Sequence, residues 1–244
     1  LLVDGLSRAR SEVSTKSTPT DMVTEMDRAS EALIVDALRA RRPDDGFVGE
    51  EGADERGTSG VQWLIDPVDG TTNYLYAFPG FAVSIAAQLD GVVVAGVVHD
   101  PLHSDVFCAA RGRGATRNGT SIHTSTLTDM SRALVGTGFS YEPERRERQA
   151  NVLIEVLPRV RDIRRMGAAS VDLCSVACGR LDAYYERGLG PWDLAAGALV
   201  AEEAGAVTGD LWGGPPSGEF VLAAAHGLFE PLRVLLDAAD AGSA

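Results

Sequence analysis

The stretch "WLIDPVDGTTNYLYAFP", residues 63–79, decides how this chain is interpreted. Its first three residues form an apolar run that is typical of a buried strand, and two aspartates follow at once. Asp66 and Asp69 stand on either side of Pro67, which stiffens the backbone and lacks an N–H group. We therefore expect the two carboxylates to converge just after the strand and the Val68 carbonyl to remain available as a neutral ligand.

Further acidic residues follow the same pattern, at the end of a strand or the start of a helix. Gly70 and Thr71 are predicted to begin a helix, and the N–H groups of a helix start suit a phosphate oxygen. Carboxylates recur in "GEEG" at 49–52 and "PWDLAAG" at 191–197, where Asp193 is expected to cap two N–H groups of its helix. Hard divalent cations such as Mg²⁺ bind carboxylate clusters together with phosphate and water. The three stretches together predict a cation and phosphate site, although each alone is more often structural.

Composition narrows the possible partners. The chain has 244 residues, 45% of them hydrophobic, and a formal net charge of −13 at pH 7. Such a charge disfavours nucleic acid or an anionic membrane surface as bulk partners. We find no apolar run long enough to span a bilayer and no secretory leader, and the three cysteines are too few for a disulfide scaffold. These features predict a cytoplasmic protein.

Strands and helices alternate along the chain. A helical period over 20–42 is ended by Pro43, and Asp90-Gly91 is predicted to turn a hairpin between two strands. Later helices are expected at 145–160, 168–179, 193–205 and 228–240, with strands at 162–166 and 181–187. Mixed runs of this kind indicate a layered α/β architecture. We expect one domain over 1–244, with an N-terminal metal-binding half at about 1–125 and a C-terminal half at about 126–244.

The full strings are more specific than any single pair of acidic residues. "DPVDGTT", preceded by "FVGEE" and followed by "RRMGAAS", "DAYYERG" and "PWDLAAG", resembles the signature of the inositol monophosphatase family. The resemblance runs from about Lys16 to the C-terminal helix. It implies a five-layer αβαβα sandwich of the inositol monophosphatase and fructose-1,6-bisphosphatase type. It also implies Mg²⁺-dependent hydrolysis of a small phosphomonoester by metal-activated water, with two or three ions per site, sensitivity to lithium and a homodimer.

The resemblance also assigns roles to individual residues. The metal ligands that it implies are Glu50, Asp66, the Val68 carbonyl, Asp69 and Asp193. A catalytic set of Glu50, Thr71 and Asp27 would position and deprotonate the attacking water. The N–H groups of Gly70 and Thr71 would hold phosphate. Contacts to the polyol would come from Ala169, Glu186, Asp69 and Asp193. Lys16 is either a contact at the rim of this site or an ordinary surface lysine.

Several alternatives remain open. The expected substrate is myo-inositol monophosphate, which Glu186 favours, but histidinol phosphate, fructose 1,6-bisphosphate and phosphoadenosine phosphate are rivals because related families share the metal motifs. A protein of another class, binding the transcription machinery, is the second hypothesis. The stretch "HDPLHSD" at 99–105 invites a zinc interpretation, but we interpret it as a hairpin end. The basic run at 111–119 is interpreted as hairpin turns rather than a nucleic-acid site.

Overall fold

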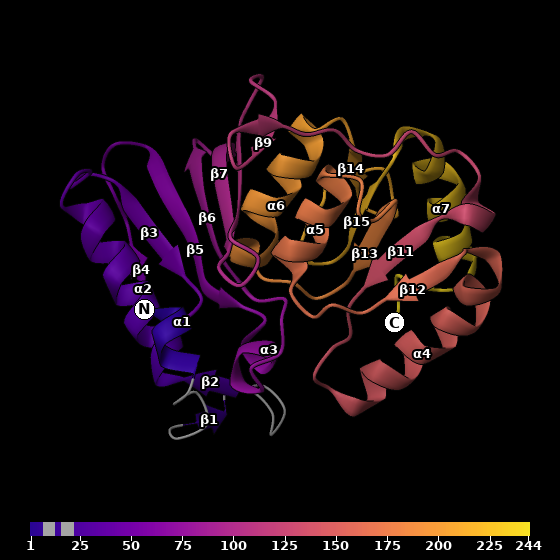
Figure 1. Ribbon diagram of the computed structural model, residues 1–244, viewed down its shortest axis with the longest axis horizontal. Coiled ribbons are helices and arrows are strands. Elements are labelled where there is room, and N and C mark those ends of the chain that lie inside the picture. Colours follow the sequence, from indigo (N-terminus) through magenta and orange to yellow (C-terminus); the bar gives the residue numbers. More distant parts are fainter. Residues whose placement is uncertain (7–12, 16–21) are drawn as a thin grey trace.

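The computed structural model describes residues 1–6, 13–15 and 22–244, whose helices and strands are stacked in layers (Figure 1). Lys16, and with it the question of a contact at the rim of the site, lies outside the described residues. One helix packs on the outer face of a large sheet, two helices separate this sheet from a smaller one, and two more cover the far side. The expected five-layer α/β sandwich is confirmed.

The large sheet contains eight of the described strands in the order β10-β9-β8-β7-β6-β5-β3-β4. Their bounds are β3 Gly46–Gly49, β4 Asp54–Glu55, β5 Val61–Asp69, β6 Ala82–Leu89, β7 Val92–Asp100, β8 Asp105–Ala110, β9 Ala115–Arg117 and β10 Thr120–Ser121. β3 and β5 are parallel, and the other neighbours are antiparallel. The predicted hairpin turn joins β6 to β7, and both Asp90 and Gly91 have positive φ, as a two-residue turn of this type requires.

The small sheet contains five described strands in the order β12-β11-β13-β15-β14. Their bounds are β11 Leu134–Thr137, β12 Asp162–Arg164, β13 Ala183–Glu186, β14 Val207–Gly209 and β15 Val221–Ala224. β11 is parallel to β12 and β13, whereas β15 is antiparallel to β13 and β14. The strands predicted from "DIRRM" and "LDAYYER" are thus neighbours of β11 in one sheet.

The helices provide the remaining layers. Their bounds are α1 Leu2–Gly5, α2 Glu25–Arg39, α3 Thr71–Leu75, α4 Pro143–Val156, α5 Ala169–Ala177, α6 Pro191–Glu203 and α7 His226–Ala238, with 3-10 turns at Met130–Arg132 and Leu157–Arg159. α2 covers the large sheet, α5 and α6 form the central layer, and α4 and α7 cover the small sheet (Figure 1).

The helix expected over 20–42 begins later than its sequence period indicates. α2 starts at Glu25, because Met22–Thr24 instead forms β2, which pairs antiparallel with β1, Val13–Thr15. Val23 and Thr24 are β-branched and suit a strand. Residues 20 and 21 lie outside the described part of the chain. The helix ends at Arg39, before Pro43 as predicted.

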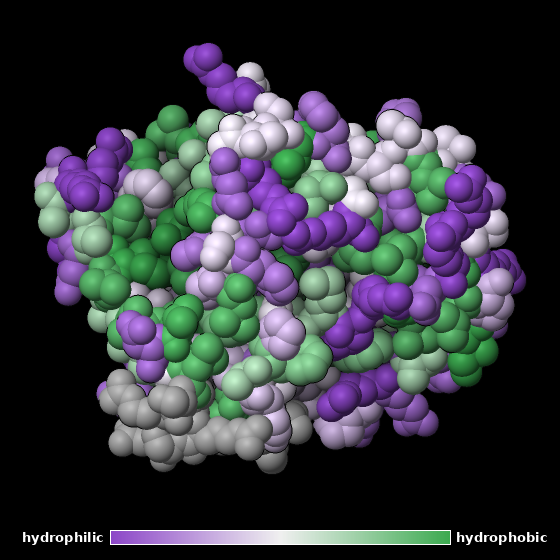
Figure 2. Space-filling view, in the orientation of Figure 1, coloured by the Kyte–Doolittle hydropathy of each residue, from purple (hydrophilic) through white to green (hydrophobic). Residues whose placement is uncertain are grey.

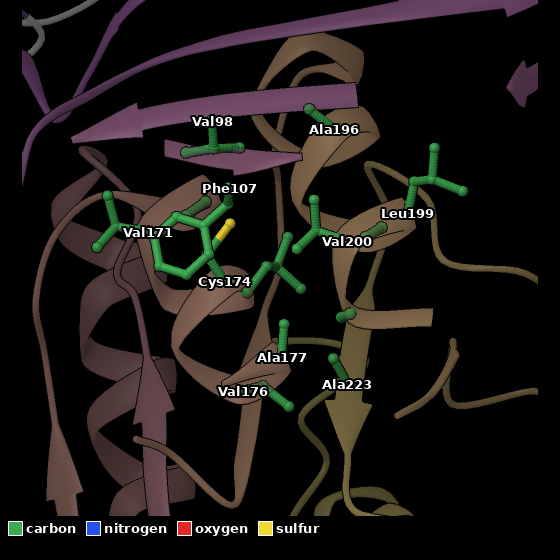
Figure 3. Packing of buried hydrophobic residues seen from close by; sticks show 14 of the residues in the cluster. Val98, Phe107, Val171, Cys174, Val176, Ala177, Ala196, Leu199, Val200 and Ala223 are labelled. Atoms are coloured by element: carbon green, nitrogen blue, oxygen red, sulfur yellow. The ribbon is translucent and has the colours of Figure 1, made fainter. Parts of the chain in front are cut away.

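The largest hydrophobic cluster lies around α5 and α6, between the two sheets. Figure 3 shows Phe107 of the large sheet directed toward α5, where it lies near Cys174. Small residues allow the layers to approach closely: a Cβ added at Gly96 of β7 would lie 2.9 Å from the Ala196 Cα of α6. This packing fixes the starts of α5 and α6 relative to the end of β5, where the candidate site is built.

The surface is mixed in character. Figure 2 shows hydrophilic residues over much of one face and hydrophobic residues gathered beside α2, over strands of the large sheet. Large apolar side chains are also exposed near the end of α3, where Tyr76 and Phe78 are 58% and 60% accessible. Within the described ranges, no helix has both the length and the apolar character needed to span a membrane.

Candidate active site

A bulge in β5 brings the two aspartates of the central motif to one side of the sheet. Asp66 pairs with Ser84 of β6 and Asp69 pairs with Ala82, so three steps along β5 face two steps along β6. Residues three apart in a regular strand point to opposite faces, and the extra residue of the bulge cancels this alternation. The aspartates were predicted to follow the strand; they lie within it, because pairing with β6 resumes at Asp69 after the bulge.

The residue that follows the bulge must be glycine. Gly70 has a φ of 88°, and α3 begins at Thr71 as predicted. A Cβ at Gly70 would lie 2.9 Å from the Gly80 carbonyl oxygen and 3.1 Å from the Ala168 Cβ. Both the left-handed backbone and the close approach of these neighbours therefore exclude a side chain here.

Helix α2 holds the hydroxyl of Thr71. The Thr71 Oγ1 lies 2.9 Å from the Asp27 Oδ1 and 3.1 Å from the Val68 carbonyl oxygen. Both neighbouring oxygens are acceptors, so the hydroxyl proton points toward them and the oxygen lone pairs of Thr71 are left for another donor. Asp27 is completely buried. The contact expected between these two distant residues is present.

Two more polar residues on the same helix face support the loops that carry the other carboxylates. The Ser30 hydroxyl donates to the Pro67 carbonyl oxygen at 3.1 Å. The Glu31 carboxylate accepts from the N–H groups of Glu51 and Ala53, at 2.8 and 2.9 Å. Sequence reasoning missed these supports. Their signal was available, since polar residues at spacings of three and four share one face of a helix.

The start of α5 fixes Asp69 from the opposite side. The Asp69 Oδ1 accepts from the Ala169 N–H at 3.1 Å, and its Oδ2 accepts from the Ser170 N–H at 2.7 Å and the Ser170 hydroxyl at 2.5 Å. A carboxylate at a helix start is stabilised by these donors and by the helix dipole. Ala169, predicted as a polyol contact, thus has its N–H directed to Asp69. Ser170 was not predicted, because its partner is about a hundred residues away.

Asp193 lies at the third position of α6 rather than at its cap. Pro191 extends the helix two residues earlier than predicted, and the Asp193 Oδ2 accepts the Gly190 N–H at 2.6 Å. The expectation that Asp193 caps two N–H groups is therefore wrong, because the helix begins before it. Asp193 and Asp66 line the same pocket, where each adds to the negative charge around the other.

Crowding of acidic groups raises their pKa values. Burial, and then the charges of Glu50, Asp69 and Asp193, raise the pKa of Asp66 well above its usual range. The pKa of Asp193 is raised in the same direction by burial and by Asp69 and Glu50. Burial also raises the pKa of Asp69 to about 6, although the hydrogen bonds from Ser170 oppose this shift. The negative charge of the cluster is therefore not neutralised by its protein surroundings.

The chemistry of this donor set fits divalent cations. Oxygen ligands in a buried, mutually repelling group are what Mg²⁺ binds in proteins, and a bound cation would offset the repulsion between these carboxylates. In the part of the chain that the structure describes, no three acidic, histidine or cysteine side chains already form a closed ligand set around one point.

Glu186 is the last residue of β13 and faces the carboxylate cluster across the pocket. The hydroxyl of the fully buried Tyr184 donates to its carboxylate. Burial raises the pKa of Glu186 to about 7, while the Tyr184 hydrogen bond and the nearby Arg165 charge oppose the shift. Arg187, the next residue in the chain, pairs with Glu219 at 3.7 Å.

One cavity, of about 160 Å³, unites these residues. Of the predicted site residues it is lined by Glu50, Asp66, Val68, Asp69, Gly70, Thr71, Ala169, Glu186 and Asp193. Asp27 lies behind Thr71 and reaches the cavity only through it. The lining also includes Phe139, Ser140, Tyr141 and Arg165, which were not predicted. These residues are brought there by the end of β11 and by the loop after β12.

The stretches set aside in the sequence are accounted for by local contacts. In "HDPLHSD", the His103 Nδ1 lies 2.7 Å from the Asp100 carboxylate within the turn between β7 and β8. Asp105 is paired with Arg117 at 2.6 Å and with Arg180 at 3.0 Å. The basic run at 111–119 forms the turns around β9, as predicted. Both stretches serve the hairpins of the large sheet.

Comparisons with known proteins show the family to which the chain belongs. A model of the inositol monophosphatase family matches residues 2–239. The chain belongs to this family. It is 46% identical over 249 residues to the inositol-1-monophosphatase SuhB of Mycobacterium tuberculosis strain H37Rv, covering 96% of this chain and 85% of the relative. It is also 41% identical over 196 residues to the Nus factor SuhB of Escherichia coli strain K12, covering 80% of this chain and 73% of the relative.

A solved structure extends the likeness to the arrangement of the layers. The extragenic suppressor protein suhB from Bartonella henselae has a TM-score of 0.92 with this inositol monophosphatase family member at 35% identity, covering 96% of this chain and 92% of that one. Membership of the family supports a phosphatase that acts on a phosphorylated substrate, and the family is generally metal-dependent.

Proposed function

We propose that the protein hydrolyses the phosphomonoester of a small polyol, with myo-inositol monophosphate as the substrate expected from the family. The observation that carries this proposal is the single cavity in which four carboxylates of the cation-binding type face Glu186. The four carboxylates suit a phosphate that is held by cations, and the carboxylate of Glu186 suits the hydroxyls of a polyol ring.

The ions proposed are Mg²⁺, two or three per site. Glu50, Asp66, Asp69 and Asp193 would hold them through carboxylate oxygens, and Val68 through its carbonyl. When bound, divalent cations lower the pKa of a water nucleophile and neutralise charge on the phosphoryl oxygens. The hydrogen bonds that Asp69 receives from α5, and Asp193 from Gly190, support this role because they orient carboxylates without consuming all their lone pairs.

The remaining residues act on water, phosphate and polyol. Thr71, whose proton is held toward Asp27, accepts a hydrogen bond from the attacking water, and Glu50 accepts the proton that the water loses. The N–H groups of Gly70 and Thr71 bind a phosphate oxygen. The polyol is contacted by Ala169, Glu186, Asp69 and Asp193. Of the three carboxylates in this set, only Glu186 is not also proposed as a metal ligand.

Phosphate release from a panel of substrates tests the proposal. Inositol monophosphate, histidinol phosphate, fructose 1,6-bisphosphate and phosphoadenosine phosphate are compared with Mg²⁺ and with excess EDTA. We expect turnover with Mg²⁺, a preference for the inositol ester, and inhibition by millimolar Li⁺. Turnover that persists in EDTA would overturn the metal role. Absence of phosphate release from every substrate would overturn the enzymatic proposal.

A second role and an assembly are also proposed from the relatives. Because some relatives carry the name Nus factor, we propose binding to the transcription machinery as an additional function. Capture of that machinery by both the wild type and an inactive Asp193→Asn variant would support a role separate from catalysis; capture by neither would overturn it. The homodimer that the family resemblance implies is tested by sedimentation, and a purely monomeric protein at micromolar concentration would contradict it.

A further inference from the structure

A glycine lies beside Glu186 where two strands of the small sheet reach the catalytic pocket. β11 and β13 are parallel neighbours, and Thr137 of β11 pairs with Tyr185 of β13. The next residues along the two strands are Gly138 and Glu186, so the register brings these two side by side. Gly138 itself does not line the catalytic pocket, whereas Glu186 does. The proposed chemistry gives no role to this glycine.

The missing side chain of Gly138 provides the space that the Glu186 carboxyl group occupies. A Cβ built at Gly138 would overlap this group, and the three atoms nearest to such a Cβ are the carboxyl carbon and both carboxyl oxygens of Glu186. The φ of Gly138 does not lie in the left-handed region, unlike that of Gly70. Alanine could therefore adopt the backbone at this position. It could do so only if the carboxyl group of Glu186 moved.

The carboxylate is also held in this space by a hydrogen bond. The Tyr184 hydroxyl donates to the Glu186 Oε2, and Tyr184 is completely buried. Residues two apart in a strand share a face, so the donor and the carboxylate lie on the same side of β13. A side chain at position 138 would thus displace the carboxylate from its donor and from its place in the pocket. Rotation of the flexible glutamate side chain is a cheaper response than unfolding.

We propose that Gly138 is a specificity-determining residue, because the space that it leaves allows Glu186 to face the hydroxyls of a polyol. Gly138 acts through Glu186 and is a positioning residue rather than a catalytic one. The inference rests on the proposed phosphatase function and deepens it: the choice of polyol depends on a position outside the pocket wall. The metal-binding carboxylates and the attacking water do not depend on this position.

Kinetics on two esters test the proposal. In Gly138→Ala, we expect KM for inositol monophosphate to rise by about tenfold with little change in kcat, because the charge-assisted hydrogen bond from the ring to Glu186 is lost. Glycerol 2-phosphate, which lacks the contacted hydroxyl, should be hydrolysed almost as before. Equal losses of kcat/KM on both esters, or no loss on either, would overturn the proposal.

Gly209→Ala is the matched control. Gly209 belongs to β14 of the same sheet, does not line the pocket and has no left-handed φ. A Cβ there would lie 3.0 Å from the Phe229 Cζ, so alanine crowds the sheet without touching Glu186. Any loss in this variant should be the same for both esters. A preference for one ester that changes as much in Gly209→Ala as in Gly138→Ala would assign the effect to crowding in general and overturn the proposal.

A double-mutant cycle shows whether Gly138 acts through the carboxylate. Glu186→Ala removes both the hydrogen-bonding group and the group that a Cβ at position 138 would overlap. In this background, Gly138→Ala should cause no further rise in KM for inositol monophosphate. A rise that is equally large with and without the carboxylate would overturn the proposal.

Thermal melting measures the same coupling without any substrate. Gly138→Ala should lower the thermal midpoint of the otherwise wild-type protein by roughly 2–4 °C, because the hydrogen bond from Tyr184 is disturbed. It should have little effect in Glu186→Ala. If the single variant does not fold, the double variant should fold, since the overlap has been removed. A double variant that also fails to fold would overturn the proposal.

The melting and kinetic results together distinguish the two possible failures. Hydrolysis of inositol monophosphate without any thermal coupling between positions 138 and 186 would overturn the role of Gly138 and leave the phosphatase intact. Thermal coupling without phosphate release from any ester would retain the contact, but it would overturn the proposed function and, with it, the role of Gly138 in the choice of polyol.

Discussion

The pocket has a carboxylate wall, formed by Glu50, Asp66, Asp69 and Asp193, and an exposed arginine, Arg165. The two differ in how firmly the surrounding structure holds their side chains. Asp66 and Asp69 are 1% and 7% exposed, and each is fixed by hydrogen bonds from buried neighbours. Arg165 is exposed and lies in the loop after β12. Groups that hold reacting atoms need fixed positions, whereas groups that recognise the far end of a ligand need charge and access.

The carboxylate wall should be the more sensitive one. Asp193→Asn is expected to lower kcat by at least ~10²-fold, because it removes a charged metal ligand. The amide oxygen can still accept the Gly190 N–H, so the thermal midpoint should change little. Steady-state kinetics and a melting curve on the same preparation measure both effects. Near-normal turnover would remove Asp193 from the ligand set.

Asp27 does not line the pocket but is hydrogen-bonded to Thr71, which does. The next prediction is that Asp27 affects catalysis through Thr71. Thr71→Ala and Asp27→Asn should each lower kcat by about tenfold or more, since each disturbs the acceptor for the attacking water. If the two residues act as one unit, the double variant loses less than the product of the single effects. A double-mutant cycle in kcat measures the coupling, and strict additivity would show independent roles.

Glu186 should affect choice of substrate more than chemistry. Glu186→Gln is expected to raise KM for inositol monophosphate by about tenfold, because a charge-assisted hydrogen bond to a ring hydroxyl is weakened. Glycerol 2-phosphate, which lacks that hydroxyl, should be hydrolysed almost as before. kcat/KM for both esters is compared in the two proteins. An equal loss on both would assign Glu186 to general support of the site, and no loss on either would remove it from the site.

Glu31 tests how much the loop behind Glu50 depends on α2. In Glu31→Gln, one of the two backbone N–H donors faces an amide NH₂ group and loses its acceptor. We expect the free energy of unfolding to fall by about 1–3 kcal/mol, and kcat to fall several-fold because the loop that carries Glu50 is held less firmly. Asp36→Asn is the control on the exposed side of the same helix, where the pair with Arg39 lies in solvent. Urea denaturation of both variants gives the comparison. Equal stabilities would show that this carboxylate does not hold the loop.

The smallest effect concerns pH and the metal-free protein. The pKa of Glu186 is raised to about 7 from an ordinary 4.5, so the folded state keeps a proton that the unfolded state loses in this range. Its contribution to the free energy of unfolding therefore falls as pH rises from about 4.5 to 7. In EDTA, the wild type should lose roughly 2 °C or more of thermal midpoint between pH 5 and 8 relative to Glu186→Gln. Parallel curves for the two proteins would contradict the shift.

The sequence allowed the carboxylate wall to be predicted because its residues lie in short, dense strings. Asp66, Asp69 and Thr71 are within six positions, and their types already indicate cation and phosphate chemistry. The residues that support these carboxylates could not be predicted in this way. Ser170 meets Asp69, and Asn73 donates to the Met166 carbonyl oxygen, across more than ninety residues. Only the fold, which brings the start of α5 and the loop before it to the end of β5 and to α3, reveals these contacts.

Arg165 was missed for a different reason. It follows another arginine in a short strand and loop, a pattern that is typical of solvated surface residues. Only the cavity that it lines together with the carboxylates, and its charge near Glu186, separate Arg165 from Arg164. Charge pairing between distant residues has no local sequence pattern.

The bulge in β5 also bears on which changes of length this gene can tolerate. An in-frame deletion of one codon within 66–69 would restore regular alternation and turn one of the two aspartates to the opposite face of the sheet. The reading frame and most of the core would survive such a deletion, and the site would not. A codon lost from the turn at 111–114, whose residues do not line the pocket, would shorten a hairpin and disturb hydrogen bonds to Glu203, but it would leave both aspartates in place. Among related genes, gaps should therefore accumulate at the hairpin tip and be absent from the bulge.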